Sequence, residues 1–239
     1  MSKKMNYKRI LLKLSGEAMK GEREYGIDPI FMNYIASEIF EAHKLGIEIA
    51  IVVGGGNIFR GVAGSKNGLD RATADYMGML ATIFNGMALQ DILEQRGLQV
   101  RLQSAIEMKQ IAESYVRRKS IRHLEKGRIV IFGGGTGLPF ITTDTAATMR
   151  ALEVGCQAIF KATKVDGVYN DDPINNPKAK KIDRLTLEEA FKNDKIKVMD
   201  KSAIELCRSN GLHVVVFNIY KKGTLKKIIL GEKAGSIIC

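Results

Sequence analysis

The strongest constraint on the fold lies in residues 129–150, which read IVIFGGGTGLPFITTDTAATMR. An apolar run from Ile129 to Phe132 predicts a buried strand, and three glycines follow it directly. A helix-like segment then begins at Thr143 or Asp144. Glycines carry no Cβ, so a ligand can come close to their N–H groups, and the helix N-terminus adds free donors and a positive dipole end. Such a corner between strand, glycines and helix is typical of an anion site, most often one for phosphate.

The same design occurs in residues 49–61, which read IAIVVGGGNIFRG and add a fixed positive charge at Arg60. We call residues 54–61 the first glycine corner and residues 133–143 the second. Neither corner completes the G-x-G-x-x-G motif of dinucleotide-binding folds, and the sequence contains no G-x-x-x-x-G-K-[ST] motif. The H-R-D and D-F-G motifs of protein kinases are also absent. Two corners in one chain predict a site that handles two phosphorylated ligands.

Length and charge narrow the possible function classes. A chain of 239 residues with 45% hydrophobic residues can form one large α/β domain or two small ones, with a sizeable core. The formal net charge is +11, but the lysines are spread from Lys3 to Lys233 rather than grouped in a stripe. That spread argues against a nucleic-acid face, and it leaves solubility or attraction of small anions as explanations of the charge.

Cysteine usage and hydropathy indicate the compartment. Cys156, Cys207 and Cys239 are far apart and form no C-x-x-C pair, which argues for a reducing compartment and against disulfides or a zinc site. No apolar run approaches the roughly 20 residues needed to span a bilayer. Lys8 and Arg9 interrupt the N-terminal stretch, so we expect no signal peptide. We therefore expect a cytoplasmic protein without a membrane partner.

Short apolar runs alternate with helical patterns, which predicts an α/β fold with a mainly parallel open sheet sandwiched by helices. We expect strands at 9–14, 47–53, 99–103, 128–132, 158–161 and 213–217, and a final strand pair near the C-terminus. We expect helices between Asp28 and Gly46, from Asp70 to about Arg96, before Gly127, from Thr143 or Asp144 to about Val154, at 187–191 and at 200–208.

The texture of the sequence changes after residue 161. Asp166-Gly167 predicts a hairpin turn, and two later proline dipeptides predict an irregular lobe. No linker composition is present, so we expect residues 1–239 to form a single domain. Its two lobes, about 1–160 and about 161–239, are expected to meet at a cleft.

The helix predicted from Asp70 to about Arg96 is apolar around most of its circumference. Such a helix is buried on more than one side, either in the core of the chain or also against a second subunit. Small residues within it would allow close approach of a partner, so we predict a homo-oligomer. Asp75 lies inside this apolar stretch, and a buried carboxylate requires partners.

Lys13 ends the first predicted strand, directly before Leu14, Ser15 and Gly16. Its ammonium group either extends into solvent from the strand end or lies at the carboxyl edge of the sheet, where ligands bind in open α/β folds. In the second case, Ser15 and Gly16 offer hydroxyl and backbone donors to a phosphate. Asp144 also has two interpretations, because an aspartate at a helix start is often an N-cap.

Six strings occur in order over nearly the whole chain, namely KLSGEA (13–18), GGGNIFRG (54–61), RATADYMGMLATIFN (71–85), GTGLPFITTDTAA (135–147), KATKVDGVY (161–169) and DDP (171–173). Together they resemble the bacterial uridylate kinases, a branch of the amino acid kinase family. Several of these strings are specific to the UMP-using branch. The triple glycines alone would fit any family member, including acetylglutamate, aspartate and carbamate kinases.

The resemblance implies ATP-dependent phosphorylation of UMP to UDP with Mg²⁺, in a homohexamer. It implies catalytic roles for Lys13, Arg60 and Asp144. Our hypothesis is that Asp144 orients Lys13 or a metal-bound water rather than accepting a proton. The residues implied in ATP binding are Lys13, Leu14, Ser15, Gly16, Gly56, Arg60, Thr163, Tyr169 and Asp172. The residues implied in UMP binding are Gly55, Asp75, Thr136, Gly137, Leu138, Pro139, Phe140, Ile141, Thr142 and Thr143. The lobe 1–160 would carry UMP and the oligomer contacts, and the lobe 161–239 would hold the nucleoside of ATP.

The resemblance also implies activation by GTP and inhibition by UTP. The region tied to the GTP response corresponds to Gly21, Glu22, Arg23, Glu24, Tyr25 and Gly26. Two positions depart from the family pattern. Leu138 replaces a polar residue that uridylate kinases often carry, and Asp200, followed by Lys201, occupies the place of a second catalytic lysine in acetylglutamate kinase. We therefore assign no second catalytic lysine and no direct Mg²⁺ ligand from the sequence.

Three other functions stay open at this stage. The first is a related kinase that acts on a carboxylate or a different phosphate, the second a nucleotide-binding regulator that touches nucleic acid, and the third a storage-type relative without turnover. Asp75 disfavours an acidic acceptor, which arginine would bind more naturally than aspartate. The presence of Lys13, Arg60 and Asp144 disfavours loss of catalysis.

Overall fold

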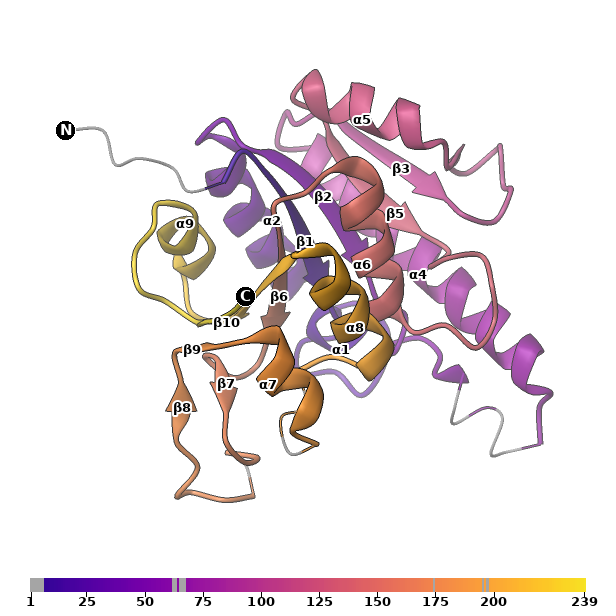
Figure 1. Cartoon of the computed structure of the whole chain (residues 1–239). Coiled ribbons are helices and arrows are strands. Elements are labelled where there is room, and N and C mark those ends of the chain that lie inside the picture. The colour runs from indigo at the N-terminus through magenta and orange to yellow at the C-terminus, as the bar shows by residue number, and fades with distance from the viewer. Residues whose placement is uncertain (1–6, 62–63, 65–67, 174, 195, 197) are drawn as a thin grey trace.

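The computed structural model describes residues 7–61, 64, 68–173, 175–194, 196 and 198–239. Within these residues the chain forms a nine-stranded sheet in the order β4-β3-β5-β2-β1-β6-β10-β11-β9, with helices on both faces (Figure 1). Each neighbouring pair in this order is parallel except β10 and β11. The predicted α/β sandwich with a mainly parallel sheet is therefore confirmed.

The strands follow the apolar runs of the sequence. They are β1 (Arg9–Leu14), β2 (Glu48–Val53), β3 (Val100–Ser104), β4 (Glu113–Ser114), β5 (Ile129–Gly133), β6 (Ala158–Thr163), β9 (Arg184–Leu185), β10 (His213–Asn218) and β11 (Ser236–Ile238). The predicted strands agree with β1, β2, β3, β5, β6 and β10 to within two residues at each end. β10 and β11 form the predicted C-terminal strand pair.

β1 lies at the centre of the sheet, between β2 and β6. Its near-continuous apolar sequence is buried on both faces, which is typical of a central parallel strand. The register places Lys13 of β1 opposite Lys161 of β6. Residues opposite each other in parallel strands point to the same face of a sheet. The two lysines are therefore brought together near the carboxyl edge of the sheet.

The helices cover the two faces in two groups. They are α1 (Gly16–Met19), α2 (Pro29–His43), α4 (Arg71–Glu94), α5 (Arg117–Glu125), α6 (Thr143–Val154), α7 (Leu187–Lys192), α8 (Lys201–Asn210) and α9 (Thr224–Ile229). α2, α4 and α9 cover the face to which Leu12 and Leu14 point, and α5, α6, α7 and α8 cover the face to which Leu11 points. Asp28 and Asp70 cap α2 and α4 with their side chains, so both predicted helix starts are confirmed.

α4 is buried on one face only. The side chains of Met79, Ile83 and Leu89 lie in the core, whereas Phe84 is 56% exposed. Tyr76, Met77, Leu80 and Met87 are exposed with it. The interpretation of this helix as one enclosed by the core of the chain is therefore wrong, and association with a second subunit stays a prediction. Among the described residues, no helix has the length and apolar character that crossing a bilayer requires.

The hairpin predicted at Asp166-Gly167 is wrong. β7 (Val168–Tyr169) pairs antiparallel with β8 (Lys181–Ile182) rather than with β6, so the connection between paired strands lies further along the chain. The Asp166 carboxylate instead accepts a hydrogen bond from the Tyr169 hydroxyl at 2.7 Å. A Cβ on Gly167 would lie 2.3 Å from the Ser236 hydroxyl oxygen. The glycine is thus required by close packing and not by a hairpin turn.

The first glycine corner offers a matched pair of substitutions. A Cβ on Gly55 would lie 2.6 Å from the Gly78 carbonyl oxygen and 2.8 Å from the Ala81 Cβ in α4. A Cβ on Gly56 would lie 3.7 Å from its nearest described neighbours. Because overpacking costs about 1–3 kcal/mol, Gly55→Ala should lower the melting temperature by several degrees. Gly56→Ala should melt close to the wild-type temperature. Equal melting temperatures of the two variants would contradict this account of the corner.

Candidate active site

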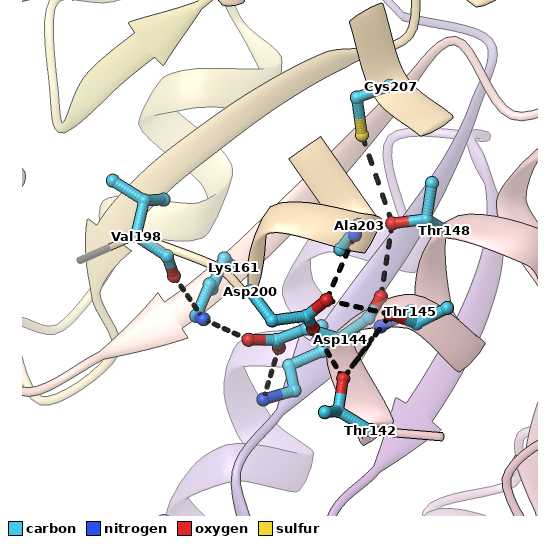
Figure 2. Close-up of polar contacts among 10 residues, drawn as sticks. Thr142, Asp144, Thr145, Thr148, Lys161, Val198, Asp200, Ala203 and Cys207 are labelled. Carbon is cyan, nitrogen blue, oxygen red and sulfur yellow. Dashed lines mark hydrogen bonds and ion pairs between the residues drawn. The ribbon is translucent and has the colours of Figure 1, made fainter. Parts of the chain in front are cut away.

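One carboxylate lies between two lysine ammonium groups. The Lys13 Nζ is 2.8 Å from the Asp144 Oδ1, and the Lys161 Nζ is 2.7 Å from the Asp144 Oδ2. Figure 2 shows Asp144 and Lys161 joined in this way beside the N-terminus of α6. The N-cap of α6 is Thr142, whose hydroxyl accepts the Thr145 N–H. The N-cap interpretation of Asp144 is therefore wrong, and its carboxylate is free to serve the two lysines.

The two lysines and the carboxylate lie in a poorly hydrated place. The side chains of Lys13, Asp144 and Lys161 are 10%, 16% and 15% exposed. Burial by itself raises the pKa of Asp144, but the charges of Lys13 and Lys161 outweigh it and lower the pKa. Burial lowers the pKa of Lys161, with the charge of Lys13 acting in the same direction and Asp144 opposing both. Two ammonium groups share the Asp144 carboxylate, and the charge of Asp200 also acts to raise the pKa of Lys161.

Lys161 was missed by the sequence analysis. It lies within the string KATKVDGVY, but nothing in that string distinguishes it from Lys164. Only the register between β1 and β6 brings it beside Lys13. Its ammonium group also donates to the Val198 carbonyl oxygen (Figure 2). Lys161, which is largely buried and paired with Asp144, is the second cation of the site, and the sequence analysis did not identify it.

Asp200 has a different task from the lysine that related kinases carry at its place. Its side chain caps α8 and accepts hydrogen bonds from the hydroxyl groups of Thr142 and Thr145 (Figure 2). It therefore ties the second glycine corner and the start of α6 to α8. Lys201 pairs with Asp194. Neither residue replaces Lys161 at the Asp144 carboxylate.

The first glycine corner packs directly on the start of α1. A Cβ on Gly16 would lie 2.5 Å from the Gly56 backbone nitrogen, so the two loops can approach only because glycine is present. Ser15 caps α1 with its hydroxyl oxygen. The Arg60 guanidinium, although 61% exposed, pairs with the Glu17 carboxylate. Glu17, which the sequence analysis did not single out, thus sets the position of the corner's cation.

The side chain of Leu14 is fully buried, and its carbonyl oxygen accepts the Gly54 N–H, so its predicted contact with ATP stays a prediction. The other residues predicted to bind the phosphates of ATP lie close together where the start of α1 meets the first glycine corner. They are Ser15, Gly16, Gly56 and Arg60.

A cavity of about 270 Å³, which we call the corner cavity, lies between the two glycine corners and α4. The residues predicted for UMP that line it are Gly55, Asp75, Thr136, Leu138, Ile141, Thr142 and Thr143. Gly56 and Arg60, which were predicted for the phosphates of ATP, line the same cavity. Phe140 contributes an N–H that donates to the Asp75 Oδ2 at 2.8 Å, and Gly137 and Pro139 belong to the same loop. The sequence analysis missed Phe59, Gly61, Arg71, Gly78, Met79, Thr82 and Gly135, which also line the cavity.

A second cavity of about 580 Å³, which we call the C-terminal cavity, lies beyond Lys161. It is lined by Thr163, Tyr169 and Asp172, the three residues that the family resemblance implies for the nucleoside of ATP. Lys161 lines it too. A smaller hollow of about 310 Å³ is lined by both Asp144 and Lys161. The corner cavity includes Thr143, the neighbour of Asp144. The carboxylate and its lysines therefore lie where spaces for two ligands approach each other.

The sequence of the chain matches that of a known family over most of its length. The sequence profile of the amino acid kinase family matches residues 8–218. The chain belongs to the amino acid kinase family. The resemblance stated from the motifs is thereby confirmed at the level of the family, and the chain is an enzyme of phosphoryl-transferring, kinase type.

Solved structures similar to this chain include two bacterial proteins. The UMP kinase from Bacillus anthracis shares 41% identity over 97% of this chain and 96% of its own, with a TM-score of 0.94. The UMP kinase from Ureaplasma parvum shares 36% identity over 98% of this chain and 99% of its own, with a TM-score of 0.90. The uridylate kinase from Archaeoglobus fulgidus, at 24% identity, 96% and 99% coverage and a TM-score of 0.72, shares the fold.

The segment predicted for GTP borders a cavity of its own, and Gly26 at its end exchanges hydrogen bonds with Asn57 of the first glycine corner. Gly21 and Glu22 line a separate open cavity of about 700 Å³ beside Phe31 and Tyr220. Arg23, Glu24 and Tyr25 are exposed, and Gly26 has a φ of +83°. The effector role of residues 21–26 stays a prediction.

The contact between Asp144 and Lys161 leads to a prediction about the pKa of Lys161. Burial, aided by Lys13 and opposed by Asp144, lowers the pKa of Lys161 from its usual 10.5. The ammonium form is thus present below the lowered pKa and is lost as the pH rises through it. Asp144→Asn should lower the pKa further, because the attractive charge is removed while burial and Lys13 remain.

A titration of labelled lysine side chains by NMR measures this pKa, and Lys161→Arg identifies the signal. A pKa at or above 10.5, or one that rises in Asp144→Asn, would show that burial does not dominate at this site.

Proposed function

We propose that this chain transfers the γ-phosphoryl group of ATP to UMP and releases UDP. One observation carries the proposal: the Lys13–Asp144–Lys161 cluster lies between two cavities, each lined by residues suited to one nucleotide. The names of the two bacterial structures at 36% and 41% identity support UMP as the acceptor. Pyrimidine nucleotide biosynthesis in the cytoplasm is the setting that this reaction implies.

The chemistry of the acceptor fits the side chains that are present. A phosphate monoester has a second pKa of about 6, so UMP is largely dianionic at neutral pH. An ionised oxygen needs no general base. The task of the enzyme is then to bring two anions together and to stabilise the phosphoryl group that passes in line between them. Buried cations and backbone N–H groups at fixed positions perform that task.

The two lysines divide the work by their positions. Lys13 lies near the end of β1, close to Ser15 and Gly16, whereas Lys161 lines the C-terminal cavity. Together with Arg60, they stabilise the charge that spreads over the transferring group. Asp144 orients both ammonium groups and accepts no proton in the reaction, because its lowered pKa keeps it ionised.

ATP occupies the C-terminal cavity in this proposal, with its nucleoside held by Thr163, Tyr169 and Asp172 from the lobe 161–239. UMP occupies the corner cavity in the lobe 1–160. Its phosphate lies between the glycine corners, and its ribose lies at Asp75. A carboxylate at that place accepts hydrogen bonds from the hydroxyl groups of the sugar.

The residues present fit a Mg²⁺ ion that arrives with the nucleotide. Among the described residues, no group of three or more metal-ligating side chains occurs, and Mg²⁺ usually keeps several waters and takes few protein ligands beside substrate phosphates. The Asp144 Oδ1 is buried and has an ion pair with Lys13 but no hydrogen bond of regular geometry, so it can still accept one from a metal-bound water. The ion supplies charge neutralisation between the phosphates.

Assembly and regulation complete the proposal. The exposed apolar face of α4 supports association of copies of this chain, and we propose a homohexamer. GTP is proposed as activator and UTP as inhibitor. Light scattering should give six times the mass of the chain, and a monomer in dilute solution would contradict the assembly.

The test of function is the release of ADP from Mg·ATP in a coupled assay, with UMP, CMP, dUMP, AMP, acetylglutamate and carbamate as acceptors. Strong turnover with UMP and little with CMP or AMP is the expected result. Turnover only with an acceptor that is not a nucleotide would be consistent with the assignment of the ATP site and would contradict the assignment of the UMP site.

Lys13→Ala should lower kcat by about 10²–10³-fold, since a preorganised group that stabilises transition-state charge is lost. Binding of UMP, measured by calorimetry, should change little because Lys13 acts at the transferring group. Lys44→Ala, at an exposed lysine that is the C-cap of α2, is the matched control and should retain wild-type turnover. Near-normal kcat in Lys13→Ala would refute the assignment.

A further inference from the structure

Arg71 is the first residue of α4 and lines the corner cavity, yet it has no role in the reaction as proposed above. Its Nε donates to both oxygens of Asp75, at 3.0 Å to Oδ1 and 2.9 Å to Oδ2. The two side chains are one helical turn apart, so α4 itself sets their separation. The arginine side chain is 41% exposed, whereas that of Asp75 is 13% exposed.

Asp75 holds a second group at the same time. Its Oδ2 accepts the Phe140 N–H at 2.8 Å. Phe140 has a φ of +66° and is the non-glycine residue with a positive φ among the described residues. A side chain in this region of φ is strained, and such strain persists only where surrounding contacts hold it. The hydrogen bond that the Phe140 N–H donates to Asp75 is one such contact.

Arg71 and Phe140 also meet directly. The Arg71 guanidinium carbon lies 5.6 Å from the centre of the Phe140 ring, within the range of a cation–π contact. The ring is 64% exposed and belongs to the loop that borders the corner cavity. Arg71 therefore touches both the carboxylate and the aromatic ring. The three residues form one unit across α4 and the second glycine corner.

The carboxylate has little freedom on its other side. A Cβ on Gly61 would lie 2.5 Å from the Asp75 Oδ1, so the backbone of the first glycine corner lies against that oxygen. A partly exposed ion pair contributes little to stability. The contacts of Arg71 are thus better explained by orientation than by stability: they fix which lone pairs of Asp75 remain open to the cavity.

We propose that Arg71 is a positioning residue for acceptor specificity, acting through Asp75 and Phe140. The inference rests on the proposed function, in which Asp75 accepts hydrogen bonds from the ribose hydroxyl groups of UMP. A site built to bind a hydroxyl discriminates against an analogue that lacks it, provided the acceptor oxygen is held in place. Arg71 holds it, and so sets the preference for ribonucleotide over deoxyribonucleotide.

The experiment compares wild type, Arg71→Ala, Arg71→Lys and Asp75→Asn with UMP, 2′-deoxyUMP and 3′-deoxyUMP as acceptors. In Arg71→Ala the KM for UMP should rise about tenfold, as expected for the loss of about one hydrogen bond, with kcat nearly unchanged. The KM for the deoxy analogue that lacks the bound hydroxyl should change little. The preference for UMP over that analogue should therefore fall about tenfold.

Two comparisons separate positioning from a general defect. Arg71→Lys retains a cation near Asp75 and should recover part of the preference, although it lacks the planar guanidinium. The double variant Arg71→Ala/Asp75→Asn should lose no more of the preference for UMP than Asp75→Asn alone, because both changes weaken the same hydrogen bond to the ribose. If Arg71→Ala does not fold, Arg71→Gln takes its place in the series.

An equal loss for UMP and both deoxy analogues, a fall in kcat alone, or additive losses in the double variant would overturn the inference. If the wild-type enzyme turns over UMP but Arg71→Ala keeps the wild-type preference for UMP over the deoxy analogues, the inference about Arg71 is wrong and the proposed function stands. No wild-type turnover with UMP would overturn the proposed function as well.

Discussion

The structure depends on one buried electrostatic arrangement, in which the Asp144 carboxylate lies between the ammonium groups of Lys13 and Lys161. Removing a single partner from such an arrangement leaves an uncompensated buried charge, so three elements must stay in register to satisfy it. β1 supplies one lysine, β6 the other, and the first turn of α6 the carboxylate. The position of Asp144 in that turn is favourable in itself, because the positive end of the helix dipole stabilises a negative charge there.

The rest of the fold can be understood as support for this arrangement. The centre of a parallel sheet fixes the register of the two lysines, and its carboxyl edge is where open α/β folds bind ligands. Asp200 ties the start of α6 to α8 through two threonine hydroxyls, which holds the carboxylate against β6. The first glycine corner packs closely on the start of α1 and on α4, because a Cβ on Gly16 would meet Gly56 and a Cβ on Gly55 would meet Gly78 and Ala81. Two lysine ammonium groups are thereby held in fixed positions before any ligand binds.

Local patterns in the sequence predicted much of the fold but only part of the site. Continuous apolar runs marked the central strands, and Asp28 and Asp70 marked helix starts, because each signal acts within a few residues. Lys13, Arg60 and Asp144 could be selected from the glycine corners and from family motifs, although their roles stay predictions. Lys161 could not be selected, since its proximity to Lys13 arises from pairing between strands about 150 residues apart in sequence. Asp166-Gly167 had the composition of a turn, but close packing on Ser236 decided its conformation.

We propose that the shared carboxylate orients the two lysines for phosphoryl transfer. The most direct measurement is kcat for the transfer from Mg·ATP to UMP in Asp144→Asn, beside the affinity of the same variant for UMP. Asparagine keeps the shape of the side chain and removes its charge. The account predicts a fall in kcat of about 10²–10³-fold with nearly unchanged UMP affinity. Wild-type kcat in a folded Asp144→Asn variant would contradict it.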